Sequence, residues 1–274
     1  MALFKKQIAS KTIYVNIENA LFEKEHFFFE AVLQGFNISQ KESVVNNSNI
    51  LFIHCNYEQK TSSQSNLVYC DTEDKYWKIR FLEEIEEWVE KNLNCTVLHG
   101  AGILYLNKKI LILGKSLSGK STLTNHLCSQ KNSQYLDDDS IYIINEKYYG
   151  LNLPQALRFI PNSNCSTVIA NFYDYSDCMR NLVQINEKID MLSSIDIILL
   201  PTFTNDSNNS YHMLTSRELL IQLINNIRVK VDMQQLMEDL SHLSKTASGY
   251  QIFYNSSQSA EEMIKTIIKN HSTR

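Results

Sequence analysis

One stretch constrains this chain more than any other: an apolar segment, a loop bounded by glycines, and a run of helix-forming residues. Residues 110–113 are apolar, Gly114 and Gly119 bracket four loop residues, and Lys120 and Ser121 follow directly. Gly-x-x-x-x-Gly-Lys-Ser between a strand and a helix is the pattern of a P-loop, whose backbone N–H groups surround phosphate oxygens. The stretch therefore predicts a nucleotide site.

The residue types in this loop suit phosphate chemistry. Gly114 permits a sharp exit from the strand, and Gly119 lets the backbone approach a ligand without an intervening side chain. We expect Lys120 to reach the β- and γ-phosphates and Ser121 to ligate Mg²⁺, with the helix dipole adding to the attraction. Three further residues complete the expected nucleotide-binding set: Ser116, Ser118 and Thr122. The alternative is a plain turn between two core elements, but a plain turn would not call for a lysine and a serine directly after the second glycine.

Composition excludes several other classes of function. The chain has 274 residues, 43% of them hydrophobic and 20% charged, and a net charge of −4. No basic stripe is present, so a nucleic-acid partner is not expected. The apolar runs are too short to span a bilayer, and the first ten residues lack the apolar core of a signal peptide. The six cysteines are scattered without a C-x-x-C pair. We expect a soluble cytoplasmic protein without a membrane partner.

Residues 1–94 have the pattern of a small mixed α/β region without recognisable chemistry. Strands are expected at residues 12–17, 49–54, 68–71 and 76–81, and helices at 18–33 and 82–93. The run Phe27-Phe28-Phe29 could form a binding face, but core packing is the favoured interpretation.

From residue 95 onward, strands and helices interleave. Strands are expected at residues 96–105, 110–113, 141–144, 195–201 and 249–254, the fourth ended by Pro201. Helices are expected after the P-loop and at residues 215–226, 233–244 and 259–269, with Thr215 or Ser216 as an N-cap. This order predicts an α/β sheet covered by helices.

Asp137, Asp138 and Asp139 follow one another just before a predicted strand. Three adjacent carboxylates are costly unless a cation lies among them, and Mg²⁺ on a nucleotide is an obvious one. The alternative is a solvated acidic turn, which the nearby P-loop disfavours.

Together these residues resemble a known family. Leu98-His99-Gly100, the hairpin and P-loop, and then Leu136-x-Asp138-Asp139-x-Ile141 are similar to the catalytic domain of HPr kinase/phosphorylase and of the shorter kinases encoded beside lasso peptides. The resemblance covers roughly residues 95–270 and, more loosely, residues 30–55. It implies a P-loop kinase domain of the HPr kinase/phosphoenolpyruvate carboxykinase type over residues 95–274, after a small α/β region at 1–94.

The resemblance also implies roles for single residues. His99 and one aspartate of the pair Asp138 and Asp139 would serve the acceptor hydroxyl, since a serine hydroxyl is a poor nucleophile until a base takes its proton. The other aspartate, assigned as Asp139, would ligate the metal with Ser121. Arg158 would contact a substrate carboxylate or phosphate.

Three positions bear on how far the resemblance extends. Leu117 stands where the family has a glycine, and Asp137 stands where a small residue is common, which leaves the carboxylate register open by one. Lys188 is a weaker match to a basic residue of the short branch. The segment by which HPr kinases dock HPr has no clear counterpart.

The expected function is an ATP- and Mg²⁺-dependent serine kinase acting on a peptide, at the C-terminal serine of a ribosomally made, lasso-type precursor. Two alternatives stay open: a related kinase of another protein or of free serine, and a non-catalytic nucleotide-binding module. The sequence leaves open the acceptor, the donor nucleotide, the reverse reaction and assembly into a homo-oligomer.

Overall fold

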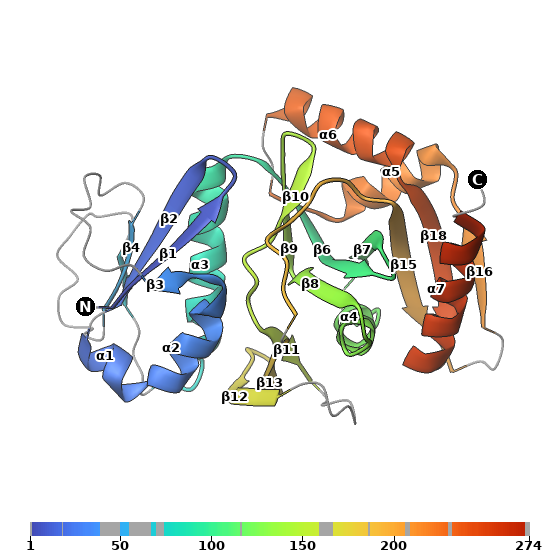
Figure 1. The fold of residues 1–274 in the computed structure, drawn as a ribbon. Coiled ribbons are helices and arrows are strands. Elements are labelled where there is room, and N and C mark those ends of the chain that lie inside the picture. Colours follow the sequence, from blue (N-terminus) through green and yellow to red (C-terminus); the bar gives the residue numbers. More distant parts are fainter. Residues whose placement is uncertain are drawn as a thin grey trace. The chain divides into compact units, whose positions relative to one another are not determined.

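The structure is a computed structural model that describes most of the chain. The described residues are 2–17, 19–38, 50–54, 67–69, 74–115, 117–158, 167–185, 187–205, 209–229 and 232–271. The chain forms two compact units (Figure 1). The N-terminal unit holds Met1–Asn94, Thr167–Gln184 and the short stretch that begins at Ala156, and the P-loop unit holds the remainder.

The P-loop unit is built on a mixed sheet. Its strands are β6 (Thr96–Tyr105), β7 (Lys108–Leu113), β8 (Ser133–Asp137), β9 (Ser140–Ile144), β10 (Lys147–Tyr149), β14 (Met191–Leu192), β15 (Ile197–Phe203), β16 (Ser210–Met213), β17 (Ile227–Val229) and β18 (Ser248–Tyr254). The main order is β14-β10-β9-β6-β7-β15-β18-β16, and β8 and β17 also pair with β6. β15 runs parallel to both β7 and β18. The predicted α/β sheet is therefore present, with a parallel centre and antiparallel flanks.

Helices cover both faces of this sheet, as Figure 1 shows. They are α4 (Lys120–Cys128), α5 (Ser216–Asn225), α6 (Met233–Thr246) and α7 (Ser257–His271). α4 and α7 bury leucine and isoleucine side chains in one core, and α5 and α6 do so in another. Thr215 is the N-cap of α5 and forms a capping box with Glu218.

β6 changes neighbours halfway along its length, and this positions the site. Its residues 96–99 pair with β9, whereas residues 102–105 pair with β8. His99 stands opposite Ser140, so the turn between β8 and β9 lies next to it. The backbone N–H of Gly100 donates to the carbonyl of Asp139 at 3.3 Å. The histidine and the aspartates singled out in the sequence thus meet where two parts of the sheet diverge.

The N-terminal unit contains a five-stranded sheet with helices. Its elements are β1 (Ala2–Ile8), β2 (Lys11–Ile17), α1 (Asn19–Lys24), α2 (His26–Val32), the 3₁₀ turn η1 (Leu33–Gly35), β3 (Asn37–Ile38), β4 (Ile50–His54), β5 (Leu67–Tyr69) and α3 (Trp77–Leu93). The sheet order is β3-β1-β2-β4-β5, and a smaller sheet joins β11 (Gln155–Leu157), β13 (Met179–Gln184) and β12 (Thr167–Tyr173). Aromatic rings of Phe28, Phe29, Trp77 and Phe81 pack together in its core, whereas Phe27 is exposed.

Three secondary-structure predictions were wrong in informative ways. The strand expected at residues 76–81 is the start of α3, because Trp77 and Phe81 bury the same helix face as Ile85. The helix expected at residues 18–33 is interrupted at Glu25. β15 continues past Pro201 to Phe203. The neighbouring strand β7 pairs only with residues 197–199 of β15, so no backbone hydrogen bond to β7 is required of Pro201, which has no N–H to donate.

Two simpler findings concern cysteines and membranes. Among the described residues, Cys95, Cys128 and Cys178 are outside any disulfide, and Cys55, Cys70 and Cys165 lie outside the described residues. Within the ranges given above, no helix is both long and apolar enough to cross a bilayer.

Candidate nucleotide and phosphoryl-transfer site

The loop between β7 and α4 has the backbone of a tight, glycine-dependent turn. The N–H of Ser118 donates to the carbonyl of Lys115 at 3.1 Å, and the N–H of Leu123 donates to the carbonyl of Gly119 at 2.9 Å. Gly119 has a φ of 91°, and a Cβ atom there would collide with the hydroxyl of Tyr254. Only glycine fits this position, so the second glycine of the motif is required by geometry.

Leu117 also adopts a left-handed backbone, with a φ of 71°, and its side chain is 77% exposed. This is the position at which the resembling family has glycine. A leucine in this conformation costs about 1–2 kcal/mol relative to a right-handed backbone. The loop therefore keeps the glycine-like conformation without the glycine.

Lys120 begins α4 and is buried. Its Nζ donates to the backbone carbonyl of Asp138 and lies 3.5 Å from Asp138 Oδ1 and 3.7 Å from Asp139 Oδ1. Burial lowers the pKa of Lys120, but the two carboxylates more than offset it, so the pKa is raised. The side chain is a fixed positive charge at the start of the P-loop helix.

Asp137, Asp138 and Asp139, together called the aspartate turn, divide into two kinds. Asp137 is 2% exposed and accepts four backbone N–H bonds. Its Oδ1 receives those of Asp138 at 2.8 Å and Asp139 at 3.4 Å, and its Oδ2 receives those of Leu151 at 2.6 Å and Asn152 at 3.1 Å. Asp137 therefore fixes the turn to the next segment, while Asp138 and Asp139 face Lys120.

Asp138 is a buried carboxylate with an unused acceptor. It is 4% exposed, and its Oδ1 accepts no hydrogen bond from any described residue. Burial raises the pKa of Asp138 to about 6, against the opposing effects of Lys120 and of a hydrogen bond from the Ser121 hydroxyl. A serine hydroxyl beside a free carboxylate oxygen is a donor set that suits Mg²⁺, which takes few protein ligands and completes its shell with phosphates and water.

Protein side chains alone do not form a metal site in the described part of the chain. In the described part of the chain, no three His, Cys, Asp or Glu residues cluster closely enough to hold an ion. Any divalent cation at Ser121 and Asp138 thus depends on oxygen atoms from a ligand such as a nucleotide.

Asp139 and His99 form the more exposed side of the site. The Asp139 side chain is 52% exposed, and its Oδ1 lies 3.9 Å from His99 Nδ1. The same nitrogen lies 3.3 Å from the Asp139 carbonyl. Burial lowers the pKa of His99, as do the charges of Lys120 and Arg228, with Asp139 opposing them. The imidazole is therefore neutral near pH 7 and can accept or pass on a proton.

The other residues predicted to bind the nucleotide differ in burial and in contacts. Ser118 Oγ is buried and finds no partner among the described residues, Ser121 is half-buried, and Thr122 is exposed on α4. Gly114 has no room for a side chain because Ser118 Oγ lies 2.5 Å from where its Cβ would be. Ser116 lies outside the described residues.

Arg158 and Lys188, the two basic residues that the resemblance suggested, contact groups outside the set around Lys120. Arg158 belongs to the N-terminal unit, where its Nη2 lies 3.7 Å from Asp174 Oδ2. Lys188 donates from Nζ to the carbonyl of Asn152 at 3.0 Å, next to the backbone that Asp137 holds. The structure therefore brings together His99, Lys120, Ser121 and the aspartate turn, and it gives Arg158 a partner outside them.

Sequence reasoning missed three residues beside this group. Phe203 and Tyr254 end β15 and β18, and both approach Gly119. They could have been found, because the carboxyl ends of parallel strands next to a P-loop strand share one edge of the sheet. Arg228, whose charge acts on His99, gave no signal because its place depends on how β17 pairs with β6.

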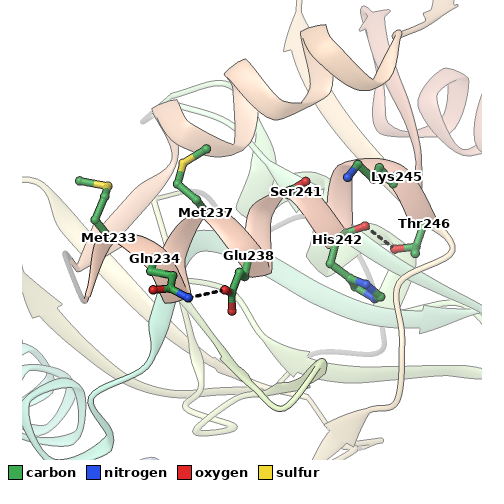
Figure 2. A pocket seen from close by; sticks show the side chains of 8 residues that line it. All are labelled: Met233, Gln234, Met237, Glu238, Ser241, His242, Lys245 and Thr246. Carbon is green, nitrogen blue, oxygen red and sulfur yellow. Dashed lines mark hydrogen bonds between the residues drawn. The ribbon is translucent and has the colours of Figure 1, made fainter.

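One surface cavity of the P-loop unit lies on α6, away from the residues of this site. Figure 2 shows an open cavity of about 820 Å³ along α6, with Met233, Met237 and His242 on its lining. All of its lining residues come from this one helix, so it lacks the convergent polar groups of a reaction site.

Comparisons with known proteins give little further information. Neither the models of known protein families nor the curated proteins give a match to this chain. Among solved structures, the chain is similar to the Hpr(Ser) kinase/phosphatase from Coxiella burnetii, with a TM-score of 0.32 and 11% identity over 65% of this chain and 90% of that one. A TM-score of this size does not establish a shared fold.

Proposed function

We propose that this chain is an ATP- and Mg²⁺-dependent kinase of the HPr kinase-like type that phosphorylates a serine hydroxyl on a peptide. The observation that carries the proposal is Lys120, a buried cation at the first residue of the P-loop helix, placed between Asp138 and Asp139 with His99 beside them. A phosphate-binding loop, a metal-suited carboxylate and a more exposed carboxylate–histidine pair are the parts that phosphoryl transfer requires.

The contacts divide the roles between the two aspartates. Asp138 shares a hydrogen bond with Ser121 and keeps a free buried oxygen, so we assign these two residues to Mg²⁺. The resemblance had suggested Asp139 for that role. Asp139 is the more exposed carboxylate and lies beside His99, so we assign it as the base for the acceptor. When bound, Mg²⁺ would neutralise charge on the phosphate oxygens.

In the proposed reaction the acceptor oxygen forms a bond to the γ-phosphorus of ATP. The bond from that phosphorus to the bridging oxygen breaks, and ADP leaves with the electron pair. The hydroxyl proton passes to the carboxylate of Asp139, which His99 polarises. Lys120 stays charged and binds the donor phosphates, an interaction that is strong because the side chain is buried.

Mass spectrometry tests the proposal directly. The protein is incubated with Mg-ATP and a panel of serine-ended peptides, HPr and free serine. We expect a gain of one phosphate, about 80 Da, on a peptide's last serine. A phosphate gained by HPr or by free serine would identify that molecule as the acceptor instead. ATP binding without phosphate transfer to any of them would indicate a non-catalytic nucleotide-binding module.

Variants connect the reaction to the site. Lys120→Ala should lose both nucleotide binding and transfer, whereas Asp139→Asn should keep nucleotide binding and lose transfer by about 10²-fold or more. Lys131→Ala, which changes an exposed lysine just after α4, is the matched control and should behave like wild type. Thermal unfolding of each variant separates loss of function from loss of fold. Transfer that survives Lys120→Ala in a folded protein would reject the P-loop assignment.

A further inference from the structure

Strand β15 passes beside both glycines of the phosphate-binding loop. Its residues 197–199 pair with β7, the strand that enters the loop, and the two strands run in the same direction. Further along β15, Cδ of Pro201 lies 3.9 Å from where a Cβ atom of Gly114 would be. Cβ of Phe203 lies 3.8 Å from where a Cβ atom of Gly119 would be. Phe203 therefore stands next to the glycine at which the loop passes into α4.

The alternation along β15 places Phe203 on the face of the sheet that α4 covers. Ile197 and Leu199 belong to the same core as Leu123 and Leu127 of α4. Every second residue of a strand points to the same face, so Phe203 continues the row of Ile197 and Leu199. Phe203 itself lies past this core and is 53% exposed. An exposed aromatic side chain is thus next to the phosphate-binding loop.

The position of Phe203 is fixed, but its ring is not enclosed. Phe203 is opposite Tyr254 in the parallel pairing of β15 with β18, and the N–H of Thr204 donates to the carbonyl of Tyr254 at 2.8 Å. The rings of Phe203 and Tyr254 have centroids 5.8 Å apart and planes at 82°. A perpendicular neighbour covers at most one face of a ring. The half-exposed ring of Phe203 therefore keeps a face open to a planar ligand.

A nucleotide held by the loop would bring its base to this edge of the sheet. Lys120 and the backbone of the loop suit the phosphates, so the rest of the nucleotide must extend beyond the loop. Ligands of open α/β sheets lie outside the carboxyl ends of the strands, and Phe203 and Tyr254 end the two parallel strands that follow β7 in the sheet. The base is the flat aromatic part of a nucleotide, and bases stack on exposed aromatic rings.

We propose that Phe203 binds the base of the donor nucleotide by stacking. The inference rests on the proposed function and adds a second contact to the nucleotide site, one that acts on the base instead of the phosphates. Single exposed apolar side chains are common on proteins, but Phe203 is distinguished by its place against the second glycine of the motif. Stacking does not read the hydrogen-bonding pattern of a base, so adenine and guanine should bind about equally well.

The test compares ligands that share a chain of three phosphates and differ in the base. The probes are the non-hydrolysable imido analogues of ATP and GTP and inorganic triphosphate, measured by calorimetry with Mg²⁺ and the full-length protein. We expect both analogues to bind at least about tenfold more tightly than triphosphate, which corresponds to 1.4 kcal/mol. Triphosphate carries at least as much negative charge as the analogues, so this preference cannot come from charge.

Variants locate the preference. Phe203→Leu keeps an apolar side chain but removes the ring, so the affinity for both analogues should fall about tenfold while triphosphate binds as in wild type. Phe203→Trp should keep or exceed the wild-type affinities, because it supplies a larger ring. Ile221→Ala, which truncates a side chain that is 50% exposed on α5, is the matched control and should change none of them. Unchanged triphosphate binding shows that the loop is folded in each variant.

Several outcomes would overturn the role of Phe203. They are equal binding of triphosphate and the analogues in wild type, full analogue affinity in Phe203→Leu, and a loss of triphosphate affinity as large as that of the analogues. A Phe203→Leu variant that binds nucleotides normally but binds a serine-ended peptide more weakly would assign the ring to the acceptor instead.

The same measurements separate this inference from the kinase proposal. Analogue binding that depends on Phe203, without phosphate transfer from Mg-ATP to any acceptor, would keep the base contact and reject the kinase. Phosphate transfer by wild type, together with full analogue affinity in Phe203→Leu, would keep the kinase and reject the base contact. Failure of wild type to bind any of the three probes would reject both.

Discussion

Asp174 in the N-terminal unit and Asp138 in the P-loop unit are both nearly buried, at 5% and 4% exposure, but their surroundings treat the negative charge in opposite ways. Asp174 Oδ1 accepts bonds from the Ser176 N–H and hydroxyl and from the Cys178 N–H. Its Oδ2 accepts a bond from Arg180 Nε at 2.7 Å. Burial alone would raise the pKa of Asp174, but these bonds hold it well below its ordinary value.

Asp138 has the opposite balance. Burial raises its pKa to about 6, and Oδ1 lacks a hydrogen-bond donor among the described residues. A buried carboxylate whose oxygens all accept hydrogen bonds stabilises a fold. A buried carboxylate that lacks a donor is unfavourable, and a ligand or cation that binds to it can supply the missing interaction. Hydrogen bonding, rather than burial or charge, thus distinguishes a structural aspartate from a candidate site aspartate here.

The largest effect is expected at Asp137, the fully satisfied member of the aspartate turn. Asp137→Asn replaces one of the two acceptor oxygens by an NH₂ group. The pair of backbone N–H groups that this oxygen accepted, either those of Asp138 and Asp139 or those of Leu151 and Asn152, then loses its acceptor. We expect a loss of about 3–5 kcal/mol in the free energy of unfolding, measured by urea denaturation. A loss below about 1 kcal/mol would show that the four bonds do not hold the turn.

The next prediction concerns pH and Asp138. Between the ordinary carboxyl pKa of 3.8 and about 6, the folded protein holds a proton on Asp138 that the unfolded chain has released. Stability should therefore fall as pH rises through this window, by about 2–3 kcal/mol, and level off above it. Asp138→Asn should remove that fall. Urea denaturation at pH 4.5, 5.5 and 6.5 with a chelator present measures it, and the same slope in both proteins would contradict the prediction.

Asp174→Asn should show the reverse pH signature and a smaller effect. Because the folded pKa of Asp174 is depressed, its stabilisation is present above the unfolded pKa and is lost as pH falls below about 4. We expect a loss of about 2 kcal/mol at pH 7 and a shallower acid limb than in wild type. Nucleotide affinity should not change. A change in nucleotide affinity would mean that Asp174 is not purely structural.

The parts of the molecule that the sequence predicted are those with local causes. The hairpin of β6 and β7, the change from strand β7 to helix α4 across the glycine-bounded loop, and the capped helix α5 follow from patterns within a few residues, and all three are present. The division of labour within the aspartate turn could not be predicted. It depends on N–H groups of Leu151 and Asn152, which only the folded chain brings to Asp137.

Long-range pairing explains the other misses. The charge of Arg228 acts on His99 only because β17, a short strand with a bulge, pairs with β6. Pro201 lies within a strand only because the neighbouring strand has already ended. Residues 76–81 looked extended because aromatic and β-branched residues favour strands, yet their burial in one core selects a helix.

Arg158 offers the smallest stability effect and the clearest way to break the comparison between the two aspartates. It lies 3.7 Å from Asp174 Oδ2, which Arg180 already binds at 2.7 Å, and its own Nε is buried without a partner among the described residues. Arg158→Gln should therefore change the free energy of unfolding by less than about 0.5 kcal/mol, because a long, partly exposed ion pair contributes little.

Arg180→Gln is the matched variant, and it should cost about 1–3 kcal/mol because it removes a short, charge-assisted bond. Urea denaturation ranks the two arginines. By the reasoning applied to Asp138, the unsatisfied Nε makes Arg158 a group that a ligand can relieve. A cost for Arg158→Gln that equals or exceeds the cost for Arg180→Gln would show that the longer ion pair, rather than the short bond from Arg180, holds the charge of Asp174.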